Sequence, residues 1–396
     1  MHNIKLMYSR LFDPLTVGKT YFLLGPRQTG KSTLLGSKVS DGRYFDLLEP
    51  VLFAELSARP QVLIEMVEAA KGDKSSPFVI DEIQKLPSLL DTVQLILSRD
   101  KRTRFILTGS SARKLRRAGQ NLLGGRARRV NFAPLTLKEL SSRQKNPVEM
   151  AMKYGGLPGI RESKAPQKEL LDYIGVYLQE EIMAEDQVRN LGAFSRFLTV
   201  AGISNSEQIN YEKVGSDSQV AGRTVKDYFD LLEDTLIGNR LESYRPTKSR
   251  KFVSAPKFYF FDVGVAHFTF RKSVESLGPS ELGKAFEHLV YCELKAYISY
   301  RKPQAELYFW RTQTGNEVDF VVQVDDELVL IEAKHTKSPN ERDTKGFRAF
   351  TEHVPKAKLK AKVLVCQAER ARRTEDGCDI LPVMKFVAAL WAGEII

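Results

Sequence analysis

Short apolar runs alternate with longer, more polar stretches over the first third of the chain. The runs within residues 21–35, 76–83 and 104–111 each lead into small or acidic polar residues. Such runs are typical of strands buried on both faces, and the stretches between them are long enough for helices. The alternation predicts an α/β fold in which helices cover both faces of a parallel sheet.

The middle of the chain changes to a helical pattern. Residues 136–200 read mainly as helices, with a break at YGGLPGI (154–160). Residues 209–243 predict a helix-turn-helix and a following strand, because apolar residues recur at helical spacing in its second helix. The repeat is carried by Val225, Tyr228, Phe229 and Leu232.

The exposed positions of that second helix balance cations with acids, which favours a contact between domains over DNA reading. The basic stretch RPTKSRKF after the next strand would form a wing. Its cations are the better candidates for contacting nucleic acid: Arg245, Lys248, Arg250 and Lys251.

Residues 315–336 hold two apolar runs around an Asp-Asp pair, which predicts a β-hairpin turning at that pair. Pairing about this centre joins residues whose numbers sum to 651, so Asp319 lies opposite Glu332. Opposed like charges destabilise a sheet, so the two carboxylates would share a cation, and Mg²⁺ or Mn²⁺ suits their oxygens. Lys334 shares their face and would orient a water or stabilise developing charge. Alternatively, these charges only protect an edge strand from aggregation.

The composition supports a folded protein with a basic surface. The chain has 396 residues, 42% of them hydrophobic, which predicts two to three domains at about 150 residues each. The formal net charge is +11, and Arg99–Arg129 alone holds eleven Lys or Arg against one acid, Asp100. Such a segment suits the phosphates of a nucleotide or a nucleic acid, or it only solubilises the surface.

The remaining bulk features indicate a cytoplasmic protein. The three cysteines have no metal-ligand or redox spacing, which fits a reducing compartment. The N-terminus lacks the apolar core of a signal peptide, and no run reaches the about 18 apolar residues of a membrane helix. We therefore expect no membrane partner.

The strongest motif is YFLLGPRQTGKSTLL (21–35), where a strand leads into Gly-x-x-x-x-Gly-Lys-Ser and a helix. Backbone N–H groups of such a loop face the phosphates of ATP, Lys31 reaches the β- and γ-phosphates, and the Ser32 hydroxyl binds Mg²⁺. The expected ATP-binding residues are Gly25, Pro26, Arg27, Gln28, Thr29, Gly30, Lys31, Ser32 and Thr33.

Two further strand ends would complete an ATP-hydrolysing site. SPFVIDEI (76–83) ends in two acids, of which Asp81 would hold the Mg²⁺ and Glu82 would polarise the attacking water. RFILTGSS (104–111) ends in small polar residues, so Thr108 or Ser110 could sense the γ-phosphate. The same residues are also ordinary turn formers.

The motifs GPRQTGKS, FVIDEI, LTGSS and LLGGR resemble those of AAA+ ATPases. With TVKDYFDLLEDT, GNEVDFVV and LIEAKHT, the chain is similar to prokaryotic ATP-binding proteins that join an AAA domain to a C-terminal domain of unknown function. The resemblance implies that Arg126 completes the site of a neighbouring subunit in a homo-oligomer, with Arg128 and Arg129 as close competitors.

The resemblance also implies the domain order. It divides the chain into an AAA+ P-loop ATPase core (1–135), a helical lid (136–200), a winged helix (201–278) and a PD-(D/E)xK nuclease-like domain (279–396). The nuclease-like set would be Glu287 on a helix, Asp319, and Glu332 with Lys334, where Asp319 and Glu332 are the metal ligands.

The expected function is ATP binding and hydrolysis by a protein that acts on nucleic acid, with a metal-dependent nuclease as a second activity. Two alternatives stay open. One is a non-nucleolytic switch in which ATP is the regulatory ligand, and the other is an ATP-driven factor that remodels proteins.

Overall fold

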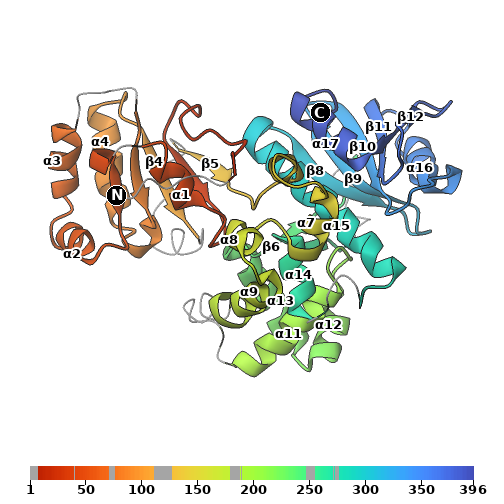
Figure 1. Ribbon diagram of the computed structural model, residues 1–396, viewed down its shortest axis with the longest axis horizontal. Helices are drawn as coiled ribbons and strands as arrows, with labels where there is room; N and C mark the ends of the chain where they lie inside the picture. The colour runs from red at the N-terminus through yellow and green to blue at the C-terminus, as the bar shows by residue number, and fades with distance from the viewer. Residues whose placement is uncertain are drawn as a thin grey trace. The chain divides into compact units, whose positions relative to one another are not determined.

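The computed structural model describes residues 8–396 apart from residues 40, 71–75, 111–126, 179–187, 189, 247–254, 271 and 273–275. The chain forms two compact units (Figure 1). Unit 1 comprises Met1–Leu135 with Asp234–Leu236, and unit 2 comprises Thr136–Glu233 with Ile237–Ile396. Among the helices of the described residues, none has both the length and the apolarity needed to cross a membrane.

Unit 1 is built on a five-stranded sheet in the order β2-β3-β4-β1-β5, and all its neighbouring strands run parallel. This confirms the predicted α/β fold with a parallel sheet. Because β4 separates β1 from β3, the loop after β1 and the turn after β3 leave the same edge of the sheet on either side of β4. The strands are β1 (Tyr21–Leu24), β2 (Tyr44–Asp46), β3 (Phe78–Asp81), β4 (Phe105–Gly109) and β5 (Arg128–Asn131).

One side of this sheet packs against helices through a continuous apolar core. Helix α4 buries Leu89, Leu90, Val93 and Ile96 at helical spacing, and these side chains join Phe105 and others from the strands. The helical elements of unit 1 are α1 (Lys31–Gly36), η1 (Asp41–Arg43), α2 (Pro50–Ala58), α3 (Val62–Ala69), η2 (Ile83–Lys85) and α4 (Leu89–Arg99).

The first part of unit 2 is mainly helical. Its helices are α6 (Leu137–Ser141), α7 (Pro147–Tyr154), α8 (Pro158–Glu162), α9 (Pro166–Asp172), η4 (Tyr173–Leu178), α11 (Leu191–Ile203), α12 (Tyr211–Ser218), α13 (Gly222–Asp234) and α14 (Val263–Thr269). Strands β6 (Gly238–Leu241) and β7 (Lys257–Phe260) form an antiparallel pair beside them.

A single apolar core holds these helices together. The expected apolar face of α13 is buried, since Val225, Tyr228, Phe229 and Leu232 all lie in this core. The same core contains Leu157 and other residues from before position 200, so it runs across the boundary expected there between lid and winged helix.

The second part of unit 2 carries a mixed six-stranded sheet in the order β12-β13-β11-β10-β9-β8. The elements are α15 (Pro279–Arg301), β8 (Glu306–Arg311), β9 (Glu317–Val324), β10 (Glu327–Ala333), η6 (Glu341–Thr344), α16 (Lys345–His353), β11 (Lys358–Cys366), β12 (Arg372–Arg373), β13 (Cys378–Pro382) and α17 (Val383–Ala392). Strands β8, β9 and β10 are antiparallel, whereas β10, β11 and β13 pair in parallel.

The β9–β10 hairpin has the predicted register. Its pairs run from Glu327 with Val324 to Ile331 with Phe320, and every pair sums to 651. The two-residue turn puts Asp325 in the left-handed region at φ 54°, a conformation that aspartate tolerates better than most residues. These pairs end there, and one further step in the same register sets Asp319 opposite Glu332, both of which are buried.

Candidate nucleotide site and acidic cluster

Contacts with Phe132 and Arg10 fix the backbone of the loop between β1 and α1. A Cβ atom on Gly25 would lie 2.4 Å from the Phe132 carbonyl oxygen, so only glycine fits there. Gly30 has φ 90°, which glycine adopts without strain. Arg10 stacks over the Phe132 ring at 4.1 Å and donates to the carbonyl of Thr29 at 2.7 Å. The loop therefore has a defined shape before any ligand arrives.

The Lys31 side chain lies inside this loop. Its ammonium group donates to the carbonyl oxygens of Gly25 at 2.7 Å and Pro26 at 2.9 Å, and the residue is only 5% exposed. These two acceptors are neutral, so a phosphate oxygen could replace them without leaving a buried charge behind. The arrangement fits the predicted role of Lys31 at the phosphates of ATP.

The structure brings together Ser32 and Asp81, the two expected Mg²⁺ ligands. The Tyr44 hydroxyl on β2 donates to Asp81 Oδ2 at 2.5 Å and also forms a hydrogen bond with Ser32. Burial, followed by the adjacent Asp81 carboxylate, raises the pKa of Tyr44 well above its ordinary value. The donor set of a hydroxyl and a carboxylate suits Mg²⁺, so the residues present fit this ion.

Glu82 directly follows Asp81 on a turn that Thr108 supports. Glu82 is in the left-handed region at φ 60°, and its backbone N–H donates to Thr108 Oγ1 at 3.0 Å. The Thr108 hydroxyl in turn donates to Asp81 Oδ1. Thr108, expected as a γ-phosphate sensor, here positions both acids from the adjacent strand.

A side-chain amide binds the Glu82 carboxylate. Gln84 Nε2 donates to Glu82 Oε2 and lies 3.3 Å from the hydroxyl of Ser110, the other expected sensor. Sequence reasoning missed Gln84, Tyr44 and Arg10 as parts of this site. Each acts through a contact that no local motif encodes, such as Arg10, which lies 123 residues from its acceptor Ala133.

Unit 2 holds the predicted acidic cluster on β9 and β10. Lys334 Nζ lies 2.9 Å from Glu332 Oε2 and 3.4 Å from Asp319 Oδ2. Burial, and then the Asp319 charge, raises the pKa of Glu332 well above its ordinary value. Burial alone would raise the pKa of Asp319 too, but the charges of Lys334 and Lys257 outweigh it, so that pKa is lowered. The two carboxyl groups also share a side-chain hydrogen bond, and Glu332 is the member of the pair whose pKa is raised.

Glu287 of α15 also joins the cluster, but with a cation that sequence reasoning missed. Lys257 Nζ on β7 lies 2.8 Å from Glu287 Oε1 and also pairs with Glu317. Tyr259 donates to the same Glu287 oxygen at 2.5 Å. Lys257 is only 3% exposed; burial alone would lower its pKa, but Glu287, Asp319 and Glu317 together raise it.

This arrangement does not fit the metal ion expected between Asp319 and Glu332. Lysine ammonium groups already lie beside all three acids, since Lys334 pairs with Asp319 and Glu332 and Lys257 pairs with Glu287. Within the part of the chain that the structure describes, no three His, Cys, Asp or Glu side chains are grouped to hold a metal. The Mg²⁺ or Mn²⁺ expected here thus has no free carboxylate set.

Several expected residues lie outside the described part of the chain. These are Arg126, the expected catalytic arginine, and the wing residues Lys248, Arg250 and Lys251. Arg245 is described and exposed. Of the acids on α13, Asp230 and Glu233 pair with Arg240 of β6 at 2.6 and 2.5 Å, so they serve contacts within unit 2.

The fold and the site together define a P-loop nucleotide-binding domain joined to a second α/β unit. Residues 17–141 match the family model described as an AAA domain. Residues 146–276 and 282–386 match two domains of unknown function, DUF8612 and DUF4143. An AAA domain at the N-terminus and a domain of unknown function at the C-terminus are the part of the expected resemblance that these matches confirm.

Similar proteins cover most of the chain. An uncharacterized protein of Mycobacterium tuberculosis, Rv2008c, is 26% identical over 343 residues, which is 84% of this chain and 74% of the relative. The uncharacterized protein MJ1544 of Methanocaldococcus jannaschii is 20% identical over 334 residues, covering 78% of this chain and 72% of the relative.

Two solved structures show a slight likeness. The Orc1 protein of Aeropyrum pernix in complex with DNA has a TM-score of 0.26 and 14% identity, over 63% of this chain and 85% of that one. Can2 from Sulfobacillus thermosulfidooxidans in complex with cyclic tetra-adenylate has a TM-score of 0.22 and 13% identity, over 96% and 99%. Neither likeness is strong enough to carry an argument.

Proposed function

We propose that unit 1 binds ATP with Mg²⁺ and hydrolyses it. The observation that carries the proposal is the position of three groups at one edge of the sheet. These are the buried Lys31 in its loop, the Ser32–Tyr44–Asp81 cluster, and Glu82 on its left-handed turn. The AAA domain matched by residues 17–141 supports the same class of reaction.

Each side chain has a distinct task in this proposal. Lys31 exchanges its two carbonyl partners for phosphate oxygens, and backbone N–H groups of the loop bind the same phosphates. Ser32 and Asp81 would hold Mg²⁺, which supplies positive charge against the phosphate oxygens. Glu82 accepts a hydrogen bond from the attacking water and orients it, while Thr108 keeps Asp81 and Glu82 in place.

Two variants test this assignment. Lys31→Ala is expected to weaken ATP binding by about 100-fold or more, because a charge-assisted contact of about 3 kcal/mol is lost. Glu82→Gln is expected to bind ATP normally but release phosphate slowly. Nucleotide titrations and steady-state phosphate release separate the two effects. Lys38→Ala, at an exposed lysine after α1, is the control. Equal ATP affinity in the wild type and Lys31→Ala would overturn the proposal.

A homo-oligomer in which Arg126 completes the neighbouring site remains part of the proposal. An arginine acting across a subunit interface supplies on the order of 10³-fold or more in rate. Arg126→Ala should then bind ATP without turnover, and mixing it with Glu82→Gln should restore some activity through hybrid interfaces. Absence of rescue in a correctly folded mixture would contradict an arginine acting between subunits.

For unit 2 we propose a non-nucleolytic role in place of metal-dependent cleavage. The specific observation is Lys257, whose buried ammonium group pairs with both Glu287 and Glu317. The carboxyl groups of Glu287, Glu317, Asp319 and Glu332 are opposed by Lys257, Lys334 and Arg311. Each acid of the cluster thus has a cation of the chain beside it, so the cluster fits a structural or binding domain of the kind expected for an ATP-dependent switch.

Metal titration tests this second proposal on the full chain. Mn²⁺ should not raise the melting temperature reported by tryptophan fluorescence, because both tryptophans, Trp310 and Trp391, lie in unit 2. DNA incubated with Mg²⁺ or Mn²⁺ should remain intact. A Mn²⁺-dependent rise that Asp319→Asn removes, or cleavage that Lys334→Ala removes, would establish the nuclease instead.

A further inference from the structure

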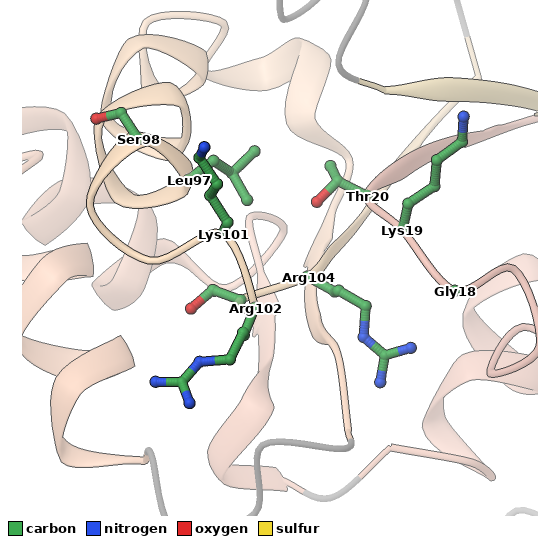
Figure 2. Close-up of a pocket in the computed structure, with 9 residues that line it drawn as sticks. Gly18, Lys19, Thr20, Leu97, Ser98, Lys101, Arg102 and Arg104 are labelled. Carbon is green, nitrogen blue, oxygen red and sulfur yellow. The ribbon is translucent and has the colours of Figure 1, made fainter.

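A basic groove lies at the amino ends of β1 and β4 in the unit 1 sheet, whereas the nucleotide loop lies at the carboxyl ends of the strands (Figure 2). The hollow has a volume of about 710 Å³. We call it the basic groove, and it is lined by Gly18, Lys19, Thr20, Leu97, Ser98, Lys101, Arg102, Thr103 and Arg104.

Four of the nine lining residues are cations and none is an acid. In Figure 2, Lys19 and Arg104 extend from the residues just before β1 and β4, while Lys101 and Arg102 extend from the loop after α4. The adjacent acid, Asp100, pairs with Arg102 at 3.4 Å, yet the Arg102 side chain stays 70% exposed. The lining therefore keeps a clear excess of positive charge.

The backbone under these cations is fixed by the sheet. Phe105 N–H donates to Thr20 Oγ1 at 3.0 Å, and Tyr21 pairs with Ile106. Following this parallel register backwards sets Lys19 beside Arg104, on strands about 4.8 Å apart. The turn between α4 and β4 is fixed as well, because Thr103 N–H donates a hydrogen bond to the Asp100 carbonyl at 3.2 Å. Lys101 and Arg102 occupy the two central positions of that turn, which face outward.

We propose that the basic groove binds the phosphodiester backbone of a nucleic acid. Leu97 is its only apolar lining residue, and it has no aromatic ring on which a base could stack. Three long, exposed cations on a rigid base, Lys19, Lys101 and Arg102, suit a row of phosphates, whereas a single small anion needs a more enclosed site. Contacts of this kind position a nucleic acid without reading its sequence. The inference does not depend on ATP hydrolysis, because the groove shares no residue with the nucleotide site.

The test uses fluorescence anisotropy of a labelled DNA duplex and single strand with the full chain over a series of salt concentrations. The variant Lys19→Glu/Lys101→Glu is compared with the control Lys38→Glu/Lys164→Glu, which changes net charge equally at exposed lysines that do not line the groove. The groove variant should bind at least about 10-fold more weakly. Its salt dependence should be shallower by about 2 in log K against log salt, because two phosphate contacts are lost.

The control should stay close to the wild type, and all three proteins should hydrolyse ATP equally without DNA. Equal weakening in both variants would overturn the proposal, because the attraction would then be a diffuse effect of net charge. Wild-type protein that binds no DNA at low salt would overturn it as well. Vesicles of anionic lipid form the last arm, and binding to vesicles without binding to DNA would also contradict it.

Discussion

Two buried lysines show how differently the two units use similar groups. Lys31 of unit 1 donates to carbonyl oxygens of its own loop, whereas Lys257 of unit 2 pairs with the carboxylates of Glu287 and Glu317. The two residues are almost equally inaccessible, at 5% and 3% exposure. A carbonyl partner can be exchanged for a phosphate oxygen, but a buried carboxylate that loses its cation is left uncompensated.

The difference separates a site prepared for a ligand from one that is complete in itself. In unit 1 the two acids expected at the site, Asp81 and Glu82, accept hydrogen bonds from neutral hydroxyl and amide groups. Around Lys257 every acid of the cluster faces an ammonium group. Unit 2 therefore opposes its acids with its own lysines, whereas unit 1 binds its acids through neutral groups.

The largest expected effect comes from removing the unit 2 cation. Lys257→Ala should lower the free energy of unfolding of unit 2 by about 3–5 kcal/mol, because it leaves the buried carboxylate of Glu287 without its cation, whereas Glu317 keeps Arg311. Urea denaturation followed by tryptophan fluorescence measures it, since Trp310 and Trp391 both lie in this unit. Adding Glu287→Gln to the variant should recover part of the loss.

The matched control for this comparison is Lys284→Ala. Lys284 pairs with Glu207 at 2.5 Å, but the two side chains are 32% and 46% exposed, so the pair should contribute about 0–1 kcal/mol. If Lys257→Ala and Lys284→Ala destabilise unit 2 equally, burial of the Lys257 pairs does not matter and the contrast between the units fails.

A smaller effect is expected from the residue that positions the acids of unit 1. Thr108→Val keeps the shape of the side chain but loses the hydrogen bonds to Asp81 and to the Glu82 backbone. Turnover should fall by about 10-fold, because one charge-assisted hydrogen bond accounts for about 1.5 kcal/mol or more, while ATP binding changes little. Thr108→Ser should keep most of the turnover. A fall in ATP affinity that matches the fall in turnover would instead support the sensor role.

Local patterns predicted the parts of both sites that depend on neighbouring residues. The nucleotide loop was predictable because glycine, lysine and serine act within one strand-loop-helix segment. The β9–β10 register was predictable because side chains alternate along a strand, so one turn position determines every pair. The opposition of Asp319 and Glu332 followed from that register.

Contacts between distant segments were not predictable. Lys257 lies 30 residues before Glu287, on a strand whose own pattern gives no reason to expect a buried charge. Tyr44 is 37 residues from Asp81 and reaches it only because β2 pairs with β3. The pairing of Lys257 with Glu287 and Glu317 was not expected because Lys257 lies outside the motif, and the sequence does not reveal the apolar core that crosses residue 200.

The two units should also differ in their response to acid. Four of the five histidines lie in unit 2, and the fifth, His2, precedes the described residues. Burial lowers the pKa of His288 to about 3 and that of His267 to about 4. A histidine with a lowered pKa contributes stability above its unfolded pKa of about 6.5 and loses it as the pH falls.

The geometry around His288 explains why its ring stays neutral. Nε2 lies 2.7 Å from the Phe260 carbonyl, which can only accept, so Nε2 carries the proton. Nδ1 must then accept from Asn205 Nδ2 at 3.0 Å, and the Asn205 amide is oriented because its oxygen accepts from Phe260 N–H at 2.9 Å. A second proton on the ring would place two donors against each other in a fully buried site.

The last prediction isolates this group by comparing the wild type with His288→Gln across pH. Buried acids of unit 2 respond in the opposite direction, as Glu293 does because burial raises its pKa to about 7, so the wild-type curve alone would mix several effects. Those effects are shared by both proteins and cancel in the difference.

Between pH 6.5 and about 4, the wild type should lose unfolding free energy relative to His288→Gln by about 1.4 kcal/mol per pH unit, because only its unfolded state takes up the extra proton. Urea denaturation followed by tryptophan fluorescence measures both proteins at half-unit steps. A difference that stays constant with pH would mean that His288 binds its proton equally well in both states, and that the Asn205–His288–Phe260 arrangement does not hold the ring neutral.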